Sequence, residues 1–552
     1  MFCPSTPFLT EDESWELFCK RAEPTTLNFK KFGKEMVGKC RGLPLAIVVL
    51  SGLLSHNMSY DYWSKVKEHI WRHLKDDDLS PQIGEILSLS FNDLSPQMKD
   101  CFLYLARYPE DHVINLDELK RLWIAEEFIS EAEEGEGVIM EDMAENCLNE
   151  LINRNLLQVN KLRWSGQVQG CRVHDLVRDL AIKKAKEHKL LGVLDAGKHH
   201  PEHIHLLEGQ PRHVIYNEIG EYLKLVERRF DALLVRSLAV VNYLSGKYEL
   251  EEMKLVCARF KNLKVLDMDS VQSKRIPEEI GDLVHLKYLC LMGGESYSDD
   301  PIEIPASIGK LKKLQTLHGG RRTYYTVPRE ICELHELRHL HIEIRGSLNI
   351  GTHQTKLQTL LRISCKEWMK IDTVNLTNLH TLCIYGEKEE NSYTLESVSN
   401  LTSLQTFILY FDPVEIPTLK PLSSCNRLKS VYLWGILKHS SELRHLPDSI
   451  TDLSLVNTKF TEDPMPTLGS LSNLTALQLT DVYQAYKGNK MVCSENGFPS
   501  VQILRLDGFF NLEELEVGEG AFPSLKQFQT RLCPKLENIP VQLAERVGAW
   551  VG

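Results

Sequence analysis

The sequence lacks closely spaced cysteines. It has 14 cysteines, but even the closest pair, Cys3 and Cys19, is too far apart for a Cys-x-x-Cys motif or a Cys/His zinc finger. The chain also opens without a signal-peptide pattern. The cysteines therefore predict reduced thiols in a cytoplasmic protein that holds no metal.

Excess positive charge and long apolar runs are missing as well. There are 64 Lys and Arg against 76 Asp and Glu, a formal net charge of −12 at pH 7, so no global basic field would attract nucleic acid or an anionic membrane. The longest apolar run, 43–54, is too short to span a bilayer and predicts a buried helix. No Ser/His/Asp or Cys/His order suggests catalysis.

What the sequence does contain is a repeat, which starts near residue 231. One apolar template returns every 20 to 28 residues, the period of leucine-rich repeats. We count about 13 units: VRSLAV (235), LKVLDM (263), LKYLCL (286), LQTLHG (314), LRHLHI (337), LQTLLRI (357), LHTLCI (379), LQTFIL (404), LKSVYL (428), ITDLSL (450), LTALQL (474), VQILRL (501) and LKQFQT (525). The pattern predicts an α/β solenoid, or horseshoe, in which stacked coils bury their leucines.

The residues between the leucines of each unit are expected to point outward on the concave side of the solenoid. Such a wide, rigid face built from exchangeable side chains suits protein recognition. Any single side chain on it is more often a solvated surface residue, but the face as a whole favours a protein partner. The candidate partner-binding residues are Lys287, Tyr288, His339, His341, Tyr432 and Trp434.

The first 190 residues have a helical period instead. Helices are expected over 13–22, with Thr10 as a possible cap, and over 29–40. Another should begin at the Gly-Leu-Pro turn, where Pro44 can occupy the first turn without losing a hydrogen bond. These elements predict an all-α subdomain.

Short helices followed by a hairpin characterise the next segment. Helical patterns cover 94–111, 115–129 and 145–159, and a polar, hairpin-like stretch at 160–170 leads into the sequence CRVHDLV. Several helices followed by two strands predict a winged-helix domain.

A near match to a phosphate-binding loop, GKEMVGKC at 33–40, is best interpreted as helix. No apolar strand precedes it, and Cys40 stands where the motif needs a hydroxyl for Mg²⁺. The stretch also keeps the helical period up to the Gly-Leu-Pro turn.

Four stretches carry a family resemblance: CRGLPLAIVVLSGLL, LSFNDLSPQMKDCFLYLARYPED, LKRLWIAEEFI and CRVHDLVRDLA, in this order and before leucine-rich repeats. The chain resembles plant intracellular NB-ARC leucine-rich-repeat disease resistance proteins of the coiled-coil subclass. The resemblance implies a helical subdomain at 1–78, a winged helix at 79–190, a linker or cap at 191–230 and repeats at 231–552. It begins at the helical subdomain, so the family's coiled coil and phosphate-binding core would lie before Met1.

The resemblance also gives a role to the sequence Val173-His174-Asp175, which is similar to the family's Met-His-Asp motif with Val in place of Met. It implies that His174 reaches the β-phosphate of ADP, that Asp175 orients it, and that Pro44 packs against the adenine or ribose. ADP or ATP would then be the ligand of the complete family protein, while no cofactor is expected for this chain alone. The alternative is that His174 is a hydrogen-bonded structural residue of the winged helix.

The function that the resemblance implies is part of a plant innate immune receptor. Its repeats would recognise a pathogen effector or a guarded host protein, and its winged helix would be the lid of an ADP/ATP switch. The alternative is a non-switching interaction protein, such as a decoy, an adaptor or a regulator of full-length receptors. The cations at 182–189 leave nucleic-acid binding as a weaker hypothesis. No enzyme is expected, because the family's ATPase residues belong to the core.

Overall fold

The computed structural model describes residues 8–73, 79–130, 139–195, 207–217, 219–229, 232–241, 250–268, 275–291, 300–320, 323–350, 353–387, 393–437, 439–481, 486, 488–537, 539–540 and 543. They fall into two compact units. The N-terminal unit is drawn from Met1–Leu162, Val168–Tyr216 and Leu234–Leu238; the repeat unit is drawn from Arg163–Gln167, Asn217–Leu233 and Ala239–Gly552. The boundary predicted at residue 78 lies outside the described residues.

The N-terminal unit begins with four helices: α1 (Glu11–Ala22), α2 (Leu27–Lys39), α3 (Pro44–His56) and α4 (Tyr60–His73). The predicted cap of α1 is confirmed, because the Thr10 hydroxyl accepts from the Glu13 N–H and the Glu13 carboxylate accepts from the Thr10 N–H. Pro44 occupies the first turn of α3, as expected. The apolar run at 43–54 lies almost entirely in this helix and is largely buried, which confirms the prediction that the run forms a buried helix.

The near match to a phosphate-binding loop is helical, as the sequence predicted. Residues 33–39 lie within α2, and Cys40 is the buried residue that ends it. Burial raises the pKa of the Cys40 thiol to about 12. The residue is therefore a neutral core thiol and not a metal ligand.

The winged helix follows in the same unit. Its helices are α5 (Leu79–Asn92), α6 (Pro96–Leu103), α7 (Leu116–Ala125), α8 (Met140–Asn153) and α9 (Asp175–Glu187), with the 3₁₀ turn η1 (Tyr104–Arg107) after α6. Strands β1 (Ile114–Asn115), β2 (Gln158–Leu162) and β3 (Val168–Arg172) form an antiparallel sheet in the order β1-β3-β2. The predicted hairpin is this β2–β3 pair.

The segment expected to be a linker or cap contains regular structure. It includes β4 (Gly192–Asp195), β5 (Arg212–Tyr216) and α10 (Ile219–Arg229), and β4 and β5 pair in parallel. Side chains tie β5 to the winged helix: Arg212 forms an ion pair of 2.6 Å with Glu126, and the Tyr216 hydroxyl donates to the Arg107 carbonyl at 2.6 Å. In the N-terminal unit these strands therefore extend the fold beyond residue 190.

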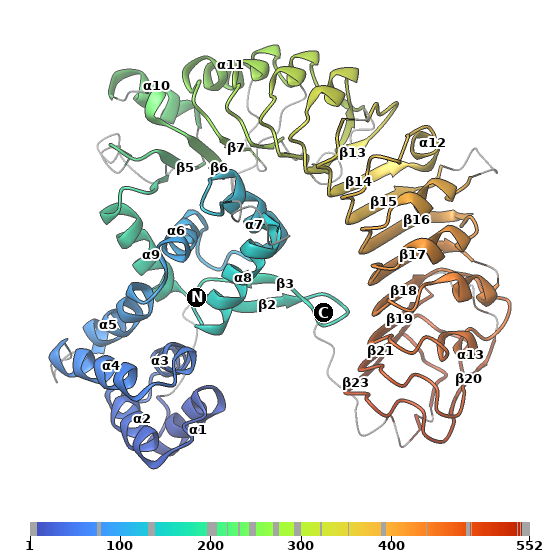
Figure 1. Ribbon diagram of the computed structural model, residues 1–552, viewed down its shortest axis with the longest axis horizontal. Helices are drawn as coiled ribbons and strands as arrows, with labels where there is room; N and C mark the ends of the chain where they lie inside the picture. The colour runs from blue at the N-terminus through green and yellow to red at the C-terminus, as the bar shows by residue number, and fades with distance from the viewer. Residues whose placement is uncertain are drawn as a thin grey trace. The chain divides into compact units, whose positions relative to one another are not determined.

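The repeat unit is built on a parallel sheet in the order β7-β8-β10-β12-β14-β15-β16-β17-β18-β19-β21-β23 (Figure 1). Each quoted repeat supplies one strand; the first lies at β6 (Ser237–Val241). The others are β7 (Val265–Asp267), β8 (Tyr288–Cys290), β10 (Thr316–His318), β12 (His339–His341), β14 (Thr359–Ser364), β15 (Thr381–Tyr385), β16 (Thr406–Glu415), β17 (Ser430–Ile436), β18 (Asp452–Val456), β19 (Ala476–Thr480), β21 (Ile503–Asp507) and β23 (Gln527–Arg531). The leucine positions stay in register from coil to coil, for example Leu382 beside Phe407 and Leu433 beside Leu455. The solenoid prediction is confirmed.

The returning segments carry short helical turns on the outer side of the sheet (Figure 1). They include η4 (Glu278–Asp282), η5 (Ala306–Lys310), η6 (Arg329–Glu333), η7 (Glu396–Asn400), η8 (Lys420–Ser424) and η9 (Ser440–His445), with α11 (Leu250–Arg259), α12 (Cys365–Trp368) and α13 (Met465–Leu468). Shorter strands lie beside the main sheet: β9 (Ile302–Glu303), β11 (Tyr324–Thr326) and β13 (Glu343–Ile344) form one group, and β20 (Lys490–Cys493) pairs with β22 (Glu514–Val517).

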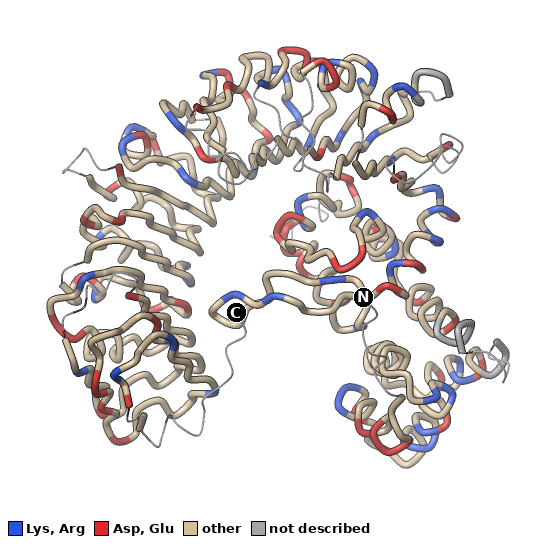
Figure 2. Tube along the Cα trace, turned by 180° about the vertical axis from the view of Figure 1, so that it is seen from behind, with Lys and Arg blue, Asp and Glu red and all other residues tan. Residues whose placement is uncertain are grey.

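Lys, Arg, Asp and Glu residues are frequent along this outer side (Figure 2). Some of them link neighbouring coils: Lys261 contacts Asp282 at 3.0 Å and Lys312 contacts Glu333 at 2.6 Å. Close backbone approach also fixes the stacking, because a Cβ on Gly281 would lie 2.4 Å from the Ser307 carbonyl oxygen. Within the described ranges, no helix has the length and apolar character needed to cross a membrane.

Candidate functional site

His174 lies at the start of α9 and is its N-cap residue. Its Nδ1 accepts a hydrogen bond from the Leu176 N–H at 3.3 Å, and its ring is half-buried. With Nδ1 used as an acceptor, the neutral ring carries its proton on Nε2, which can donate to a further group. The backbone therefore selects the tautomer, whereas the resemblance assigned the orienting role to Asp175, an exposed residue in the first turn of α9.

Pro44 is half-buried in the first turn of α3. Its helix and the helix of His174 both pack against α5. The structure thus explains how each residue is held at a helix N-terminus, and a shared contact of Pro44, His174 and Asp175 with a nucleotide stays a prediction.

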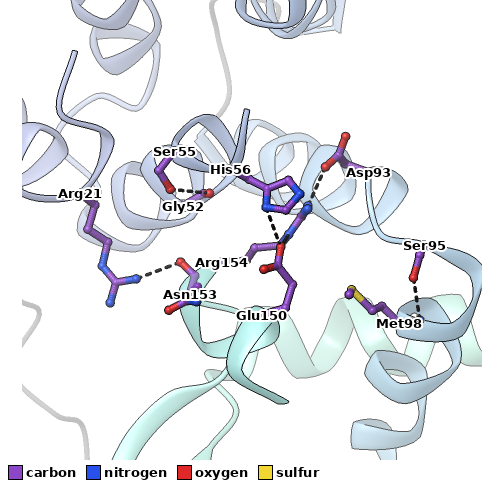
Figure 3. Close-up of polar contacts among 10 residues, drawn as sticks. All are labelled: Arg21, Gly52, Ser55, His56, Asp93, Ser95, Met98, Glu150, Asn153 and Arg154. Atoms are coloured by element: carbon purple, nitrogen blue, oxygen red, sulfur yellow. Dashed lines mark hydrogen bonds and ion pairs between the residues drawn. The ribbon is translucent and has the colours of Figure 1, made fainter. Parts of the chain in front are cut away.

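A network of charges joins the helical bundle to the winged helix, and the sequence reading missed it (Figure 3). Its centre is Arg154, which follows α8 and whose side chain is 4% exposed. The guanidinium donates to Glu150 at 2.6 Å and to Asp93 at 2.7 Å, and the same Glu150 oxygen lies 3.0 Å from Nδ1 of His56. We call these four side chains the junction network.

Backbone contacts close the same junction. Arg21 of α1 donates to the Asn153 carbonyl at 2.9 Å (Figure 3). Asn155 donates to the Val48 carbonyl of α3 at 2.7 Å. Gly52 lets α3 approach closely, because a Cβ there would lie 2.8 Å from the Asn153 carbonyl oxygen. One of the carbonyl groups that the C-terminal end of α8 leaves open, that of Asn153, is therefore satisfied by the helical bundle.

Burial and charge oppose each other at Arg154. Burial lowers its pKa, while the hydrogen bonds to Glu150 and Asp93 raise it, and the pKa ends above the ordinary value. The guanidinium therefore stays charged, compensated by two carboxylates. The contact of this network that crosses to the helical bundle is the one between Glu150 and His56 of α3.

The candidate residues on the concave face of the repeats differ in exposure. Tyr288 is 0% exposed and His339 is 6% exposed, which corrects the expectation that both face solvent. Tyr288 lies in register between Val265 and Thr316, both buried, and Nδ1 of His339 lies 3.1 Å from the Thr359 hydroxyl. Both side chains are therefore part of the packed structure.

The other four candidates are half-exposed: Lys287, His341, Tyr432 and Trp434. His341 stacks on the equivalent residue of the preceding coil, His318, with ring centroids 4.5 Å apart. Tyr432 and Trp434 both pack against Tyr410 of the preceding coil, at 5.6 and 5.9 Å. Tyr432 and Trp434 are thus exposed in part, as the sequence predicts, and their role in partner binding stays a prediction.

A hollow of about 730 Å³ adjoins this cluster and brings together residues that the sequence reading did not single out. We call it the aromatic pocket; it is lined by Tyr324, Glu343, Arg345, Gly346, Arg362, Tyr385, Glu387, Tyr410 and Trp434. All come from consecutive coils of the repeat unit. Two arginines, two glutamates and four aromatic rings give it the composition of a binding hot spot.

A bulge in β14 places Arg362 at this pocket. The β14–β15 register shifts between Leu360 and Ile363, and Arg362 has a φ of 59°, in the left-handed region. The sequence carries a sign of it, because the unit LQTLLRI is one residue longer than LHTLCI or LQTLHG. A bulged strand re-aims its side chain, which is how Arg362 meets Glu343.

Comparison with known proteins identifies both units. Residues 235–544, more than half of the chain, match a leucine-rich repeat region, and residues 108–181 match the winged helix domain of disease resistance proteins. Among curated proteins of Arabidopsis thaliana, the disease resistance RPP13-like protein 3 is 34% identical over 567 residues, covering 99% of this chain and 61% of the relative. Disease resistance protein RPP13 is 36% identical over 533 residues, covering 95% and 58%.

A third relative from the same plant, the disease resistance RPP8-like protein 2, is 30% identical over 556 residues, covering 96% of this chain and 60% of the relative. The chain spans about three fifths of the length of these curated relatives. The repeat region and the winged helix occur here in one chain, in the order that the resemblance implied. The chain belongs to the leucine-rich-repeat disease resistance proteins of plants.

Proposed function

We propose that this chain acts in plant immunity as a receptor whose repeats bind a protein, either a pathogen effector or a host protein that such an effector alters. The observation that supports this most is the aromatic pocket on a rigid parallel sheet, in a chain that also carries a winged helix of the disease-resistance type. Half-exposed Tyr, Trp and Arg side chains are those that dominate protein interfaces. We place this activity in the cytoplasm and assign it to binding, not to catalysis.

The N-terminal unit would serve as the lid of a nucleotide switch. His174 supports this assignment, because its Nδ1 is occupied by the Leu176 N–H and its Nε2–H can donate to a phosphate oxygen. Pro44 would contact the adenine or ribose, and Asp175 would lie beside the phosphate-binding imidazole. When the complete protein binds ADP, the nucleotide would hold the lid closed. A protein bound to the repeats would favour release of the lid.

The receptor assignment is tested with plants that lack the gene. Mutant and wild-type plants are inoculated with a panel of pathogen isolates, and pathogen growth in the leaf is measured. We expect at least one isolate to grow to a clearly higher titre in the mutant, and a transgene to restore resistance. Equal growth of every isolate in both genotypes would contradict the assignment.

The nucleotide assignment is tested on protein expressed from the complete gene. Bound nucleotide is released by acid and quantified by chromatography for wild type, His174→Ala and the control His188→Ala, which changes the other end of α9. Losing a charge-assisted hydrogen bond of ~2 kcal/mol should weaken ADP binding roughly 10-fold or more in His174→Ala alone. Equal ADP content in all three proteins would contradict a role for His174.

A further inference from the structure

The aromatic pocket contains a ladder of rings, one from each of three successive coils. Tyr385 lies in register with Tyr410, and Tyr410 with Trp434. Strands of a sheet are about 4.8 Å apart, so the three side chains occupy neighbouring positions along the sheet. The ring centroids of Tyr410 and Trp434 are 5.9 Å apart and their planes are inclined by 59°. These two rings are therefore tilted instead of stacked flat on one another, and all three side chains are half-exposed.

Hydrogen bonds fix two of these rings. The Tyr385 hydroxyl donates to the Ile344 carbonyl at 2.9 Å, and the indole N–H of Trp434 donates to Asp412 at 3.2 Å. Asp412 is held in turn by a hydrogen bond of 3.3 Å from Asn457. Because the polar atoms of Tyr385 and Trp434 already have hydrogen-bond partners, these two rings offer a ligand their π-faces, where the ring quadrupole is negative.

Three of the four charged residues of the pocket form an ion pair or a cation–π contact with another pocket residue, and the fourth, Glu387, forms neither within the described part of the chain. Arg362 forms an ion pair with Glu343, and Arg345 lies over the ring of Tyr324, with its guanidinium carbon 3.8 Å from the centroid. Among the described residues, no hydrogen bond or ion pair reaches the carboxylate of Glu387, an exposed residue after β15. The Arg362–Glu343 pair is therefore internally compensated and the charge of Arg345 faces the Tyr324 ring, which leaves Glu387 as the carboxylate that a cationic ligand can reach.

The pKa of Tyr385 indicates which charges act most strongly at its ring. Burial raises the pKa of its hydroxyl most, and the carboxylates of Glu387 and Glu343 raise the pKa further, while Arg345 lowers it. The negative charges thus outweigh the positive one at this ring. A neutral tyrosine beside a carboxylate is an environment that attracts cations.

We propose that the aromatic pocket docks a cationic side chain, an arginine or a lysine, presented by the protein that the repeats bind. The cation would lie over the faces of Tyr410 and Trp434 and form an ion pair with Glu387. This inference rests on the proposed function, since it names the chemistry by which the repeats recognise their partner. Arginine is the better fit, because its planar guanidinium can stack on a ring and hydrogen-bond a carboxylate at the same time.

The test uses small probes and the full chain. Saturation-transfer NMR measures binding of N-acetyl-arginine methylamide, its lysine analogue, the neutral citrulline analogue and the glutamate analogue. We expect the arginine and lysine probes to bind, and citrulline, which has the shape of arginine without the charge, to bind roughly fivefold to tenfold more weakly. The relative affinity of the two cationic probes then tells which residue the partner presents.

Two variants place the binding in the pocket. Glu387→Gln removes the open carboxylate from an exposed position, and Trp434→Leu removes one ring; each should weaken the arginine probe roughly fivefold. The matched control is Glu396→Gln, in the outer turn η7, which should leave the affinity unchanged. Thermal unfolding of each variant verifies that it is folded, and Glu387→Gln tests the proposal even if Trp434→Leu does not fold.

Several outcomes would overturn the proposal. They are equal binding of the arginine and citrulline probes, preference for the glutamate probe, no binding of either cationic probe up to its solubility limit, or an unchanged affinity in Glu387→Gln. None of these measurements depends on an immune response. If the probes fail while the gene still confers resistance, the assignment of the pocket is wrong and the receptor function stands.

Discussion

Arginine–carboxylate pairs occur in both units, but in opposite settings. In the junction network of the N-terminal unit, Arg154 is 4% exposed and has two carboxylates within 2.7 Å. In the aromatic pocket of the repeat unit, the Arg362 side chain is 45% exposed and has one carboxylate partner, Glu343. A buried pair is costly to break because the remaining partner is left uncompensated, whereas an exposed pair contributes little to stability. The buried charge of the junction therefore maintains the fold, whereas the exposed pair of the pocket contributes little to stability and leaves Glu387 of the same pocket for binding.

The largest expected effect is at the centre of the junction network. Arg154→Met removes the two charge-assisted hydrogen bonds to Glu150 and Asp93, whose side chains are 18% and 29% exposed, and should lower the free energy of unfolding by about 3 kcal/mol. The measurement is urea denaturation of the full chain followed by circular dichroism at the helical band, because the helices are concentrated in the N-terminal unit. The control is Lys20→Met, which breaks an exposed pair with Glu16 and should cost less than about 1 kcal/mol. Similar losses in the two variants would remove the distinction between buried and exposed pairs.

The pH dependence of stability extends the comparison of buried and exposed charges to His213 of β5, which is 1% exposed. Burial lowers its pKa to about 4, although the hydrogen bond to the Gln210 carbonyl opposes the shift. The unfolded chain therefore binds a proton that the folded chain does not, and stability is lost as the pH falls from about 6.5 towards 4. The loss amounts to about 3 kcal/mol.

Urea denaturation of the wild type and His213→Gln at several pH values checks this expectation. The variant should be less stable at neutral pH but should lose less of its stability on acidification, because its amide does not titrate. Parallel pH curves for the two proteins would show that His213 is not the group responsible.

Two helical glycines distinguish a packed junction from an open helix surface. A Cβ on Gly52 would meet the backbone of Asn153 and Arg154, while a Cβ on Gly38 would meet no atom within 4 Å. Gly52→Ala should therefore destabilise the chain by about 1–3 kcal/mol through overpacking. Gly38→Ala should stabilise it by about 0.5–1 kcal/mol through helix propensity. Thermal unfolding of both variants measures these changes in stability. A stabilising Gly52→Ala would mean that α3 and the end of α8 are not in close contact.

The smallest expected effect on stability is in the aromatic pocket. Glu387 is exposed, and among the described residues its carboxylate has no ion-pair partner. Glu387→Gln should therefore change the free energy of unfolding by less than about 0.5 kcal/mol. Urea denaturation followed by tryptophan fluorescence measures it. A loss of stability comparable to that of Arg154→Met would show that Glu387 supports the fold and would contradict its assignment to binding.

Much of the fold follows from periodicity. The spacing of leucines predicted the solenoid, and the helical period with Thr10 and Pro44 as start signals predicted α1 and α3. These features are local, so the sequence alone contains the information. The hairpin of the winged helix was located in the same way, from polar residues between two short strands.

The errors and omissions concern contacts between distant residues. A period of two predicts which way Tyr288 and His339 point, but not what covers them. The ion pair of Asp93 with Arg154 joins residues 61 positions apart, and no local pattern announces it. The position of Arg362 could have been predicted from the sequence, because the extra residue in LQTLLRI marks the bulge that places this side chain at the pocket.

The most direct test of the central claim is a crystal structure of the full chain soaked with N-acetyl-arginine methylamide. The account predicts electron density for the guanidinium among Tyr385, Tyr410 and Trp434, beside the carboxylate of Glu387, with the Arg362–Glu343 pair still formed. Density for the probe at another surface would contradict the claim that Glu387 is the carboxylate that binds the cation. An Arg362–Glu343 pair that opens so that Glu343 takes up the probe would contradict it as well.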